Sequence, residues 1–231
     1  MKTRQFLVVG LFLFISASPL WATRRTASID SLKNRAAQGD VDAQFNLGVM
    51  YVGGQGVQRD YTEALKWFTL AAAQGDAGAQ SNLGVMYAKG HGVQQDYRQA
   101  LTWFTLAAAQ GDAGAQSNLG AMYAEGQGVR KDYAKSLKWY RLAAAQRDAK
   151  AQNNIGVIYY KGHGVPQDYR QALTWFTLAA AQGEAGAQYN LGAMYAKGQG
   201  GKQDYAEALT WFTLAAAQGE AGAQYLSLIH I

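Results

Sequence analysis

The chain has 231 residues, of which 49% are hydrophobic and 16% charged, with 27 glycines, 2 prolines and no cysteine. This composition excludes a disordered chain and collagen, and the lack of cysteine excludes disulfide scaffolds, thiolate metal sites and cysteine nucleophiles. The net charge of +5 falls to +3 once Lys2 and Arg4 leave with the leader described next, which is too little to indicate a nucleic-acid partner.

The N-terminus has the three parts of a secretory signal peptide. Lys2 and Arg4 give it a positive start, residues 6–15 form an apolar run, and a segment of small residues leads to Ala22. We predict a signal peptide over residues 1–22 and a mature protein that is periplasmic or secreted. An uncleaved anchor is the alternative, but the apolar run is only about half as long as a bilayer span. No later segment resembles a membrane span.

After residue 39 the sequence repeats every 36 residues. A Gly, a Tyr, an Asp-Tyr pair and a Trp recur at this interval, and the stretch TLAAAQGDAGAQSNLG occurs identically at 69–84 and 105–120. A fixed period of this length indicates stacked units that form one elongated domain. The predicted solenoid spans 40–225, with units at 40–75, 76–111, 112–147, 148–183 and 184–219 and a partial unit at 220–225.

Each unit is predicted to contain two short helices separated by a glycine-rich loop. In the first unit Asp40 is the expected N-cap of one helix, and the glycines within 53–56 end it. Asp60 opens the second helix, and Glu63 is placed to complete a capping box. Helices of three to four turns are unstable alone, so we expect stacking between units to stabilise them. Residues 23–39 are predicted to form an N-terminal capping helix.

The repeated pattern A-x-A-Q-x-N-L-G-x-M-Y, followed by G-x-G-V-x-x-D-Y-x-x-A-L-x-W-F and A-A-A-Q-G, resembles the Sel1-like repeat. This 36-residue repeat is a relative of the tetratricopeptide repeat. The resemblance implies an all-α, right-handed α/α solenoid of five helix–turn–helix repeats that acts as a protein–protein interaction scaffold. One departure is Gly201, which stands where the other units have Val, and we expect it to loosen the last loop.

The sequence contains no pattern typical of a catalytic, cofactor or metal site. The Gly-x-Gly loops lack the strand and third glycine of a dinucleotide site, and the motifs of serine and zinc hydrolases are absent. His91 and His163 lie two units apart, on the order of 20 Å in a stack of helix layers, so we interpret them as solvated loop residues. We assign the repeated tryptophans to packing within and between units: Trp67, Trp103, Trp139, Trp175 and Trp211. We therefore predict a protein that is not an enzyme and needs no cofactor.

One repeated polar residue points to binding. An Asn precedes the Leu or Ile of the first helix in every unit, and the residue before it is the most varied in that helix. Asn is a poor helix-interior residue. In tetratricopeptide solenoids the first helices line a concave groove, and a matching Asn often bonds a peptide backbone. A constant amide beside a varied side chain suits peptide readout. The candidate residues for a protein or peptide partner are Phe45, Asn46, Ser81, Asn82, Ser117, Asn118, Asn153, Asn154, Tyr189 and Asn190.

Three alternatives to this hypothesis remain. In the first alternative, the repeated Asn amides have a structural role and link adjacent units. In the second, the protein is a regulatory or assembly factor and the partner binds its convex face. The third alternative is a cell-wall-active or β-lactam hydrolase-like enzyme, by analogy with cysteine-rich secreted relatives. This chain lacks both their cysteines and a nucleophile motif.

The end of the chain departs from the pattern. After Tyr225 the repeat predicts Asn-Leu-Gly, but the sequence continues Leu-Ser-Leu-Ile-His-Ile. These residues, 226–231, resemble the translation of a transposon-end adapter used in DNA library preparation. We predict that they are not native and that the natural protein continues into a sixth repeat, so we assign no function to His230.

Overall fold

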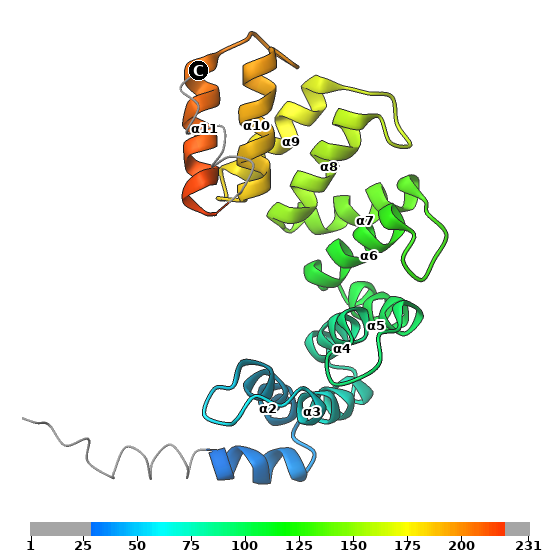
Figure 1. The fold of residues 1–231 in the computed structure, drawn as a ribbon. Coiled ribbons are helices and arrows are strands. Elements are labelled where there is room, and N and C mark those ends of the chain that lie inside the picture. The colour runs from blue at the N-terminus through cyan, green and yellow to red at the C-terminus, as the bar shows by residue number, and fades with distance from the viewer. Residues whose placement is uncertain (1–28, 220–231) are drawn as a thin grey trace, which may run out of the picture.

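A computed structural model describes residues 29–219, which form a stack of helices curved into a C shape (Figure 1). Within this range there are eleven helical segments and no strand. The predicted all-α solenoid of helical pairs is thereby confirmed. The predicted signal peptide (1–22), the partial repeat (220–225) and the predicted non-native tail (226–231) all lie outside the described residues.

A short helix over residues 29–37 precedes five helical pairs. The first helices of the pairs are α2 (Val41–Gly53), α4 (Ala77–Lys89), α6 (Ala113–Glu125), α8 (Ala149–Lys161) and α10 (Ala185–Lys197). The second helices are α3 (Tyr61–Ala73), α5 (Tyr97–Ala109), α7 (Tyr133–Ala145), α9 (Tyr169–Ala180) and α11 (Tyr205–Ala217).

An acidic side chain caps the start of each of these ten helices. The Asp40 carboxylate, for example, accepts a hydrogen bond from the Ala43 amide at 2.9 Å. Each first helix ends before a glycine in the left-handed conformation, with φ between 65° and 78°. Because glycine adopts this conformation without steric cost, the predicted role of the loop glycines is confirmed.

The capping box predicted at Asp60 and Glu63 is only half formed. The Asp60 carboxylate accepts the Glu63 amide at 3.1 Å, but the Asp60 amide donates to the Tyr51 carbonyl at 3.0 Å. Since that amide is already used, the Glu63 carboxylate pairs instead with Lys66, 2.5 Å away. The same Asp-to-Tyr backbone bond recurs in every pair, and it joins the start of the second helix to the end of the first.

The two helices of a pair approach closely where a glycine faces an aromatic ring. A Cβ atom added at Gly84 would lie 2.5 Å from Cδ1 of Phe104, well inside normal contact. Gly48, Gly120, Gly156 and Gly192 face rings of the other pairs in the same way. The rings of this position are buried and belong to the core of each pair.

The tryptophans pack successive pairs together. Trp103 packs against a buried cluster that includes Phe68 and Leu83, contributed by α3 and α4. Trp139 packs in the same way against a cluster that includes Phe104 and Leu119. The predicted packing role of the repeated tryptophans is confirmed at these interfaces.

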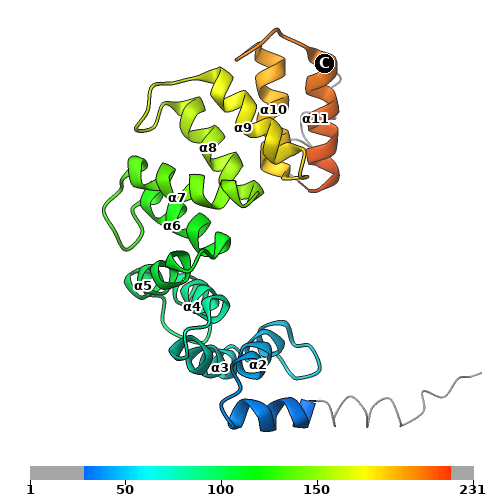
Figure 2. The same ribbon diagram turned by 180° about the vertical axis from the view of Figure 1, so that it is seen from behind.

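The first helices lie on the inner side of the curve. α2 contacts α4, α4 contacts α6 and α6 contacts α8, whereas within residues 29–219 no two second helices of neighbouring pairs approach as closely. Elements inside a bend are closer together than those outside it. The first helices therefore line the hollowed side, which both ribbon views show (Figures 1 and 2).

Candidate functional site

Three residues of each first helix form a stripe along the inner side. They are the repeated Asn, the residue three positions later and the residue four positions after that, a spacing that places them on one helix face. All are exposed or half-buried. This groove stripe comprises Asn46, Val49 and Gly53; Asn82, Val85 and Lys89; Asn118, Ala121 and Glu125; Asn154, Val157 and Lys161; and Asn190, Ala193 and Lys197.

Two depressions lie along the stripe in the third to fifth pairs. The α6–α8 depression has a volume of about 380 Å³, and its lining includes Glu125, Tyr140 and Asn154. The α8–α10 depression, of about 240 Å³, lies between α8 and α10. Because Val157 and Lys161 line both, the depressions are adjoining parts of one groove.

The repeated Asn side chains do not share one role. Asn82 donates to the Gly78 carbonyl of its own helix at 2.8 Å. Asn190 donates to the Asn153 side-chain oxygen of the preceding pair at 3.0 Å. Three others have no side-chain hydrogen bond within residues 29–219: Asn46, Asn118 and Asn154. The inner face therefore carries free amides at three of its five levels.

The varied residues beside these amides have contacts within the chain. Ser81 donates to the Asp112 carboxylate at 3.0 Å, and Ser117 forms the same bond to the next N-cap at 3.2 Å. Phe45 packs on the Phe68 ring, with centroids 5.9 Å apart, and Tyr189 packs similarly on the ring of its own pair. The free polar groups of the inner face are consequently those of the groove stripe.

The two histidines lie in loops and are half-buried, and each packs on an aromatic ring that the sequence analysis did not anticipate. His91 stacks on Tyr61 with ring centroids 4.5 Å apart, and His163 stacks on Tyr133 at the same distance. Each tyrosine belongs to the preceding pair, about thirty residues earlier in the chain, so the contact is invisible in the local sequence. Residues 29–219 contain no group of three His, Asp or Glu side chains suited to a metal ion.

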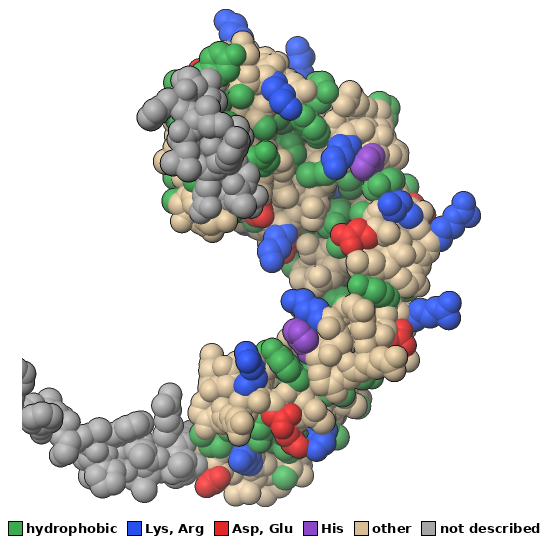
Figure 3. All heavy atoms as spheres, in the orientation of Figure 1, with side chains coloured by type: hydrophobic (Ala, Val, Ile, Leu, Met, Phe, Trp, Pro, Cys, Tyr) green, Lys and Arg blue, Asp and Glu red, His purple; other side chains and the backbone are tan. Residues whose placement is uncertain are grey.

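Unpaired positive charge lines the groove. Lys161 and Lys197 belong to the stripe, and Lys131 lies at the α6–α8 depression. Glu125 is the acidic residue of the groove stripe. The ion pairs of residues 29–219 all involve other side chains, so these four charges form no ion pair there. Lys131 Nζ lies over the Tyr133 ring, 5.7 Å from its centroid. Figure 3 shows Lys and Arg side chains along the hollowed side of the molecule.

Tyr140 brings a hydroxyl group to the α6–α8 depression. The other four pairs have phenylalanine at this position: Phe68, Phe104, Phe176 and Phe212. The Tyr140 side chain is only 3% exposed, and its hydroxyl has no hydrogen-bond partner within residues 29–219. Burial raises the pKa of Tyr140, and the charges of Glu125 and Asp148 raise it further. The hydroxyl therefore keeps its proton and can donate a hydrogen bond to a ligand.

Five consecutive segments of the chain match the family model of the Sel1 repeat: 41–76, 77–112, 113–148, 149–184 and 185–220. The chain belongs to the Sel1 repeat family. Sel1 repeat proteins generally mediate protein–protein interactions, and scaffolds of this family are generally not enzymes. The family predicted from the sequence is confirmed.

Solved structures of Sel1 repeat proteins resemble this one. A protective antigen of uropathogenic Escherichia coli with an SLR fold is 37% identical, with a TM-score of 0.80 over 88% of this chain and 44% of the antigen. This chain thus spans less than half of that protein. A Sel1 repeat protein from Oxalobacter formigenes is 34% identical, with a TM-score of 0.83 over 90% of this chain and 83% of that one.

A more distant structure shares the fold alone. An immunity protein from Pseudomonas aeruginosa is 20% identical, with a TM-score of 0.56 over 87% of this chain and 82% of that one. A search of curated proteins gave no match. Within residues 29–219, no helix of this Sel1 repeat protein is long and apolar enough to cross a membrane.

A buried glutamine relay, which the sequence analysis missed, joins each Sel1 repeat to the one before it. Gln116 is 5% exposed, its Nε2 donates to the Ala108 carbonyl at 3.2 Å, and its Oε1 accepts from Gln146 Nε2 at 3.0 Å. The same relay passes through Gln44, Gln80, Gln152 and Gln188. The available signal was a glutamine at fixed positions among apolar residues, in the A-x-A-Q and A-A-A-Q motifs. Its role is to satisfy buried polar groups between repeats.

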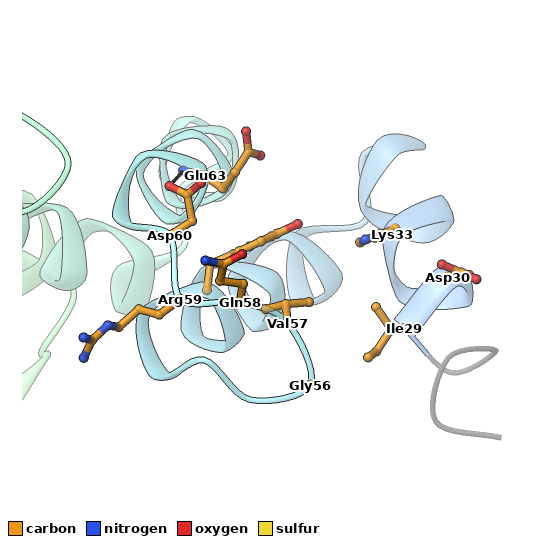
Figure 4. Close-up of a pocket in the computed structure, with 10 residues that line it drawn as sticks. Ile29, Asp30, Lys33, Gly56, Val57, Gln58, Arg59, Asp60 and Glu63 are labelled. Carbon is orange, nitrogen blue, oxygen red and sulfur yellow. Dashed lines mark hydrogen bonds between the residues drawn. The ribbon is translucent and has the colours of Figure 1, made fainter. Parts of the chain in front are cut away.

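A larger cleft, of about 620 Å³, lies between the helix over 29–37 and the loop of the first repeat (Figure 4). Two of its three carboxylates are used within the chain, since Asp60 caps α3 and Glu63 pairs with Lys66. The Arg59 side chain extends away from the N-terminal helix (Figure 4). The cleft is therefore a boundary between two packed elements, and its charged groups do not converge on a ligand.

Proposed function

We propose that this Sel1 repeat protein is an exported scaffold that binds an extended protein segment in the groove along its first helices. The observation that carries the proposal is the set of free amides on the inner face, at Asn46, Asn118 and Asn154. A peptide in an extended conformation has backbone donors and acceptors that need partners, and amide side chains supply both.

A second candidate surface is the outer face, because every second helix carries an exposed leucine. The exposed fraction of these side chains is between 44% and 47%: Leu70, Leu106, Leu142, Leu178 and Leu214. Exposed apolar patches often mark interaction sites. We favour the groove because it combines depressions with polar and charged groups that form no hydrogen bond or ion pair within residues 29–219, whereas none of these leucines lines either depression.

The two surfaces can be separated by paired substitutions. Dodecapeptides selected from a random phage library on the purified chain are titrated by fluorescence anisotropy. Asn118→Ala with Asn154→Ala should weaken binding by about tenfold or more, since each lost hydrogen bond contributes roughly 1 kcal/mol. Leu106→Ala with Leu178→Ala on the outer face should leave the affinity unchanged. The reverse pattern would assign binding to the outer face.

Asn82→Ala is the matched control for the groove amides. Its amide bonds within its own helix, so its loss should affect peptide binding less than that of Asn118 or Asn154. Thermal unfolding of all variants shows whether the fold is intact. If the double Asn variant unfolds or loses several kcal/mol of stability, the amides are structural and the groove proposal fails.

Export is supported by the signal-peptide pattern of residues 1–22. A fusion of residues 1–30 to alkaline phosphatase, which is active only after export, should give activity in bacterial cells. The mature chain should begin near Thr23 by N-terminal sequencing. Accumulation of the uncleaved chain in the cytoplasm would contradict this part of the proposal.

A further inference from the structure

The α6–α8 depression gathers hydrogen-bond donors that have no partner in the described chain. Tyr140 contributes a hydroxyl and Asn154 an amide, and both lie in its lining. Lys131 and Lys161 add two ammonium groups that form no ion pair within residues 29–219. Glu125 is the one carboxylate of the lining. The depression therefore offers several donors, and its lining carries two lysines against one carboxylate, while Asp148 is a second negative charge that acts on Tyr140.

Tyr140 shows that this set is specific to one place in the array. The equivalent residue is phenylalanine in the other four repeats, so a hydroxyl is not required for packing. The hydroxyl is not one of the fully buried polar atoms of residues 29–219 that lack a partner, so it is accessible from the depression. A ligand with an acceptor group can bond to it, whereas phenylalanine offers no donor.

The adjoining α8–α10 depression has a different character. Its lining includes the apolar side chains of Val157, Phe176 and Ala193, with Lys161 and Lys197 as its two charged residues. The Tyr160 hydroxyl in this lining is already bonded to the Gln199 side chain at 3.0 Å. This depression suits an apolar side chain next to a negative charge.

We propose that the groove selects an acidic protein segment, with a carboxylate side chain in the α6–α8 depression and a neighbouring apolar side chain in the α8–α10 depression. The inference rests on the proposed groove function and adds the chemistry of the bound segment. Carboxylates accept several hydrogen bonds at once and are attracted by ammonium groups, whereas a basic segment would face three unpaired lysines.

The test compares three pools of dodecapeptides that differ only in two residues flanking a central Leu or Phe. The flanking residues are Glu, Gln or Lys, and binding to the purified chain is followed by fluorescence anisotropy. The Glu pool should bind about tenfold more tightly than the Gln pool and still more tightly than the Lys pool. The preference for Glu should shrink as salt is raised, because salt screens exposed charges.

Tyr140→Phe is the decisive variant because four other repeats already fold with phenylalanine there. It should weaken binding of the Glu pool by about tenfold, the effect of removing a hydrogen bond to a charged acceptor, and affect the Gln pool less. Lys161→Gln should reduce the preference for Glu over Gln. Leu106→Ala on the outer face is the control and should leave the preference unchanged.

Each outcome decides the question. If the Glu and Gln pools bind equally, or if Tyr140→Phe and Lys161→Gln leave the preference intact, the acidic-segment inference is wrong while groove binding stands. If no pool binds, the proposed function fails and the inference fails with it. If single-stranded DNA or phosphatidylserine vesicles bind more tightly than the Glu pool with the same sensitivity to Lys161→Gln, the lysines serve a polyanion and the inference is overturned.

Discussion

The close approach between Gly84 and Phe104 gives a sharp test of how the repeat is built. A Cβ atom at residue 84 would lie 2.5, 2.6 and 2.9 Å from three carbon atoms of the Phe104 ring. Carbon atoms in ordinary contact are about 3.5–4.0 Å apart, so the two helices would have to separate by about 1 Å. Phe104 is only 2% exposed, so its ring is enclosed by other atoms of the core.

The magnitude follows from two opposing terms. Overpacking a well-packed core by one methyl group costs about 1–3 kcal/mol, and a clash with a buried ring belongs at the upper end. Alanine regains about 1 kcal/mol over glycine in a helix interior. Gly84→Ala should therefore lower the free energy of unfolding by about 2 kcal/mol, measured by urea denaturation of the full chain with far-UV circular dichroism.

Gly114→Ala is the matched control, since it is the same substitution in a first helix. Its new Cβ would lie 3.4 Å from Asp112 Oδ1 and 3.9 Å from Ser81 Oγ, which are ordinary contacts. It should leave stability unchanged or raise it by up to about 1 kcal/mol. In a Phe104→Leu background the cost of Gly84→Ala should shrink, because the flat ring is gone. Equal effects of the two alanine substitutions in the wild-type background would refute the packing argument.

Two further predictions concern groups that the repeats share. Gln116→Ala should lower the free energy of unfolding by about 2–4 kcal/mol in the same assay, because it removes two hydrogen bonds of a buried side chain and opens a cavity. Gln94→Ala at an exposed loop position should change little. Arg147→Gly should raise stability by about 0.5–1 kcal/mol, since Arg147 has a φ of 68° where the other repeats have glycine. The reverse change Gly111→Arg, at a φ of 93° with open space around it, should lower stability. Stability changes of the same sign for the two substitutions would contradict this.

The fold was predictable because the period itself carries the information. The packing glycine, the tryptophan and an acidic N-cap recur in register in every unit, and stacking is the arrangement that places them in equivalent environments. The capping box failed for a reason that local sequence does not contain. The Asp60 amide is used by Tyr51 of the preceding helix, so Glu63 was left without its expected partner.

The glutamine relay and the histidine stacking depend on contacts about thirty residues apart or with the neighbouring repeat. Gln44 accepts from Gln74, and His91 stacks on Tyr61. No spacing rule for a single helix links these positions. A repeat period predicts that such contacts exist between neighbours, but which side chains meet depends on the rotation between repeats.

The candidate site was predictable only in part. Asn82 and Asn118 end identical stretches of sequence, TLAAAQGDAGAQSN, yet Asn82 bonds to the carbonyl of Gly78 and Asn118 has no hydrogen bond within residues 29–219. Two Asn side chains in identical local sequence therefore differ in whether their amide groups are available to bind a partner. The position of the amides on the first helices follows from periodicity, while their freedom to bind depends on neighbours that the pattern does not specify.

Within each repeat, one set of residues packs the helices and another set lines the groove. This separation explains how such an array can acquire a specific partner. The packing glycine, the facing ring and the N-cap carboxylate hold the helices of one repeat in place, and the relay glutamine joins that repeat to the one before it, so a change in any of them disturbs packing. The side chains of the groove stripe make few contacts that the packing of the repeats requires. The last residue of the stripe in each first helix is Lys in three repeats, Glu in one and Gly in one. Tyr140 shows that a core position can vary as well. Its ring packs as the phenylalanines of the other repeats do, and its added hydroxyl gives the groove a hydrogen-bond donor without altering the packing of the repeats. A duplicated array can thus gain binding chemistry one residue at a time while every repeat keeps the same fold.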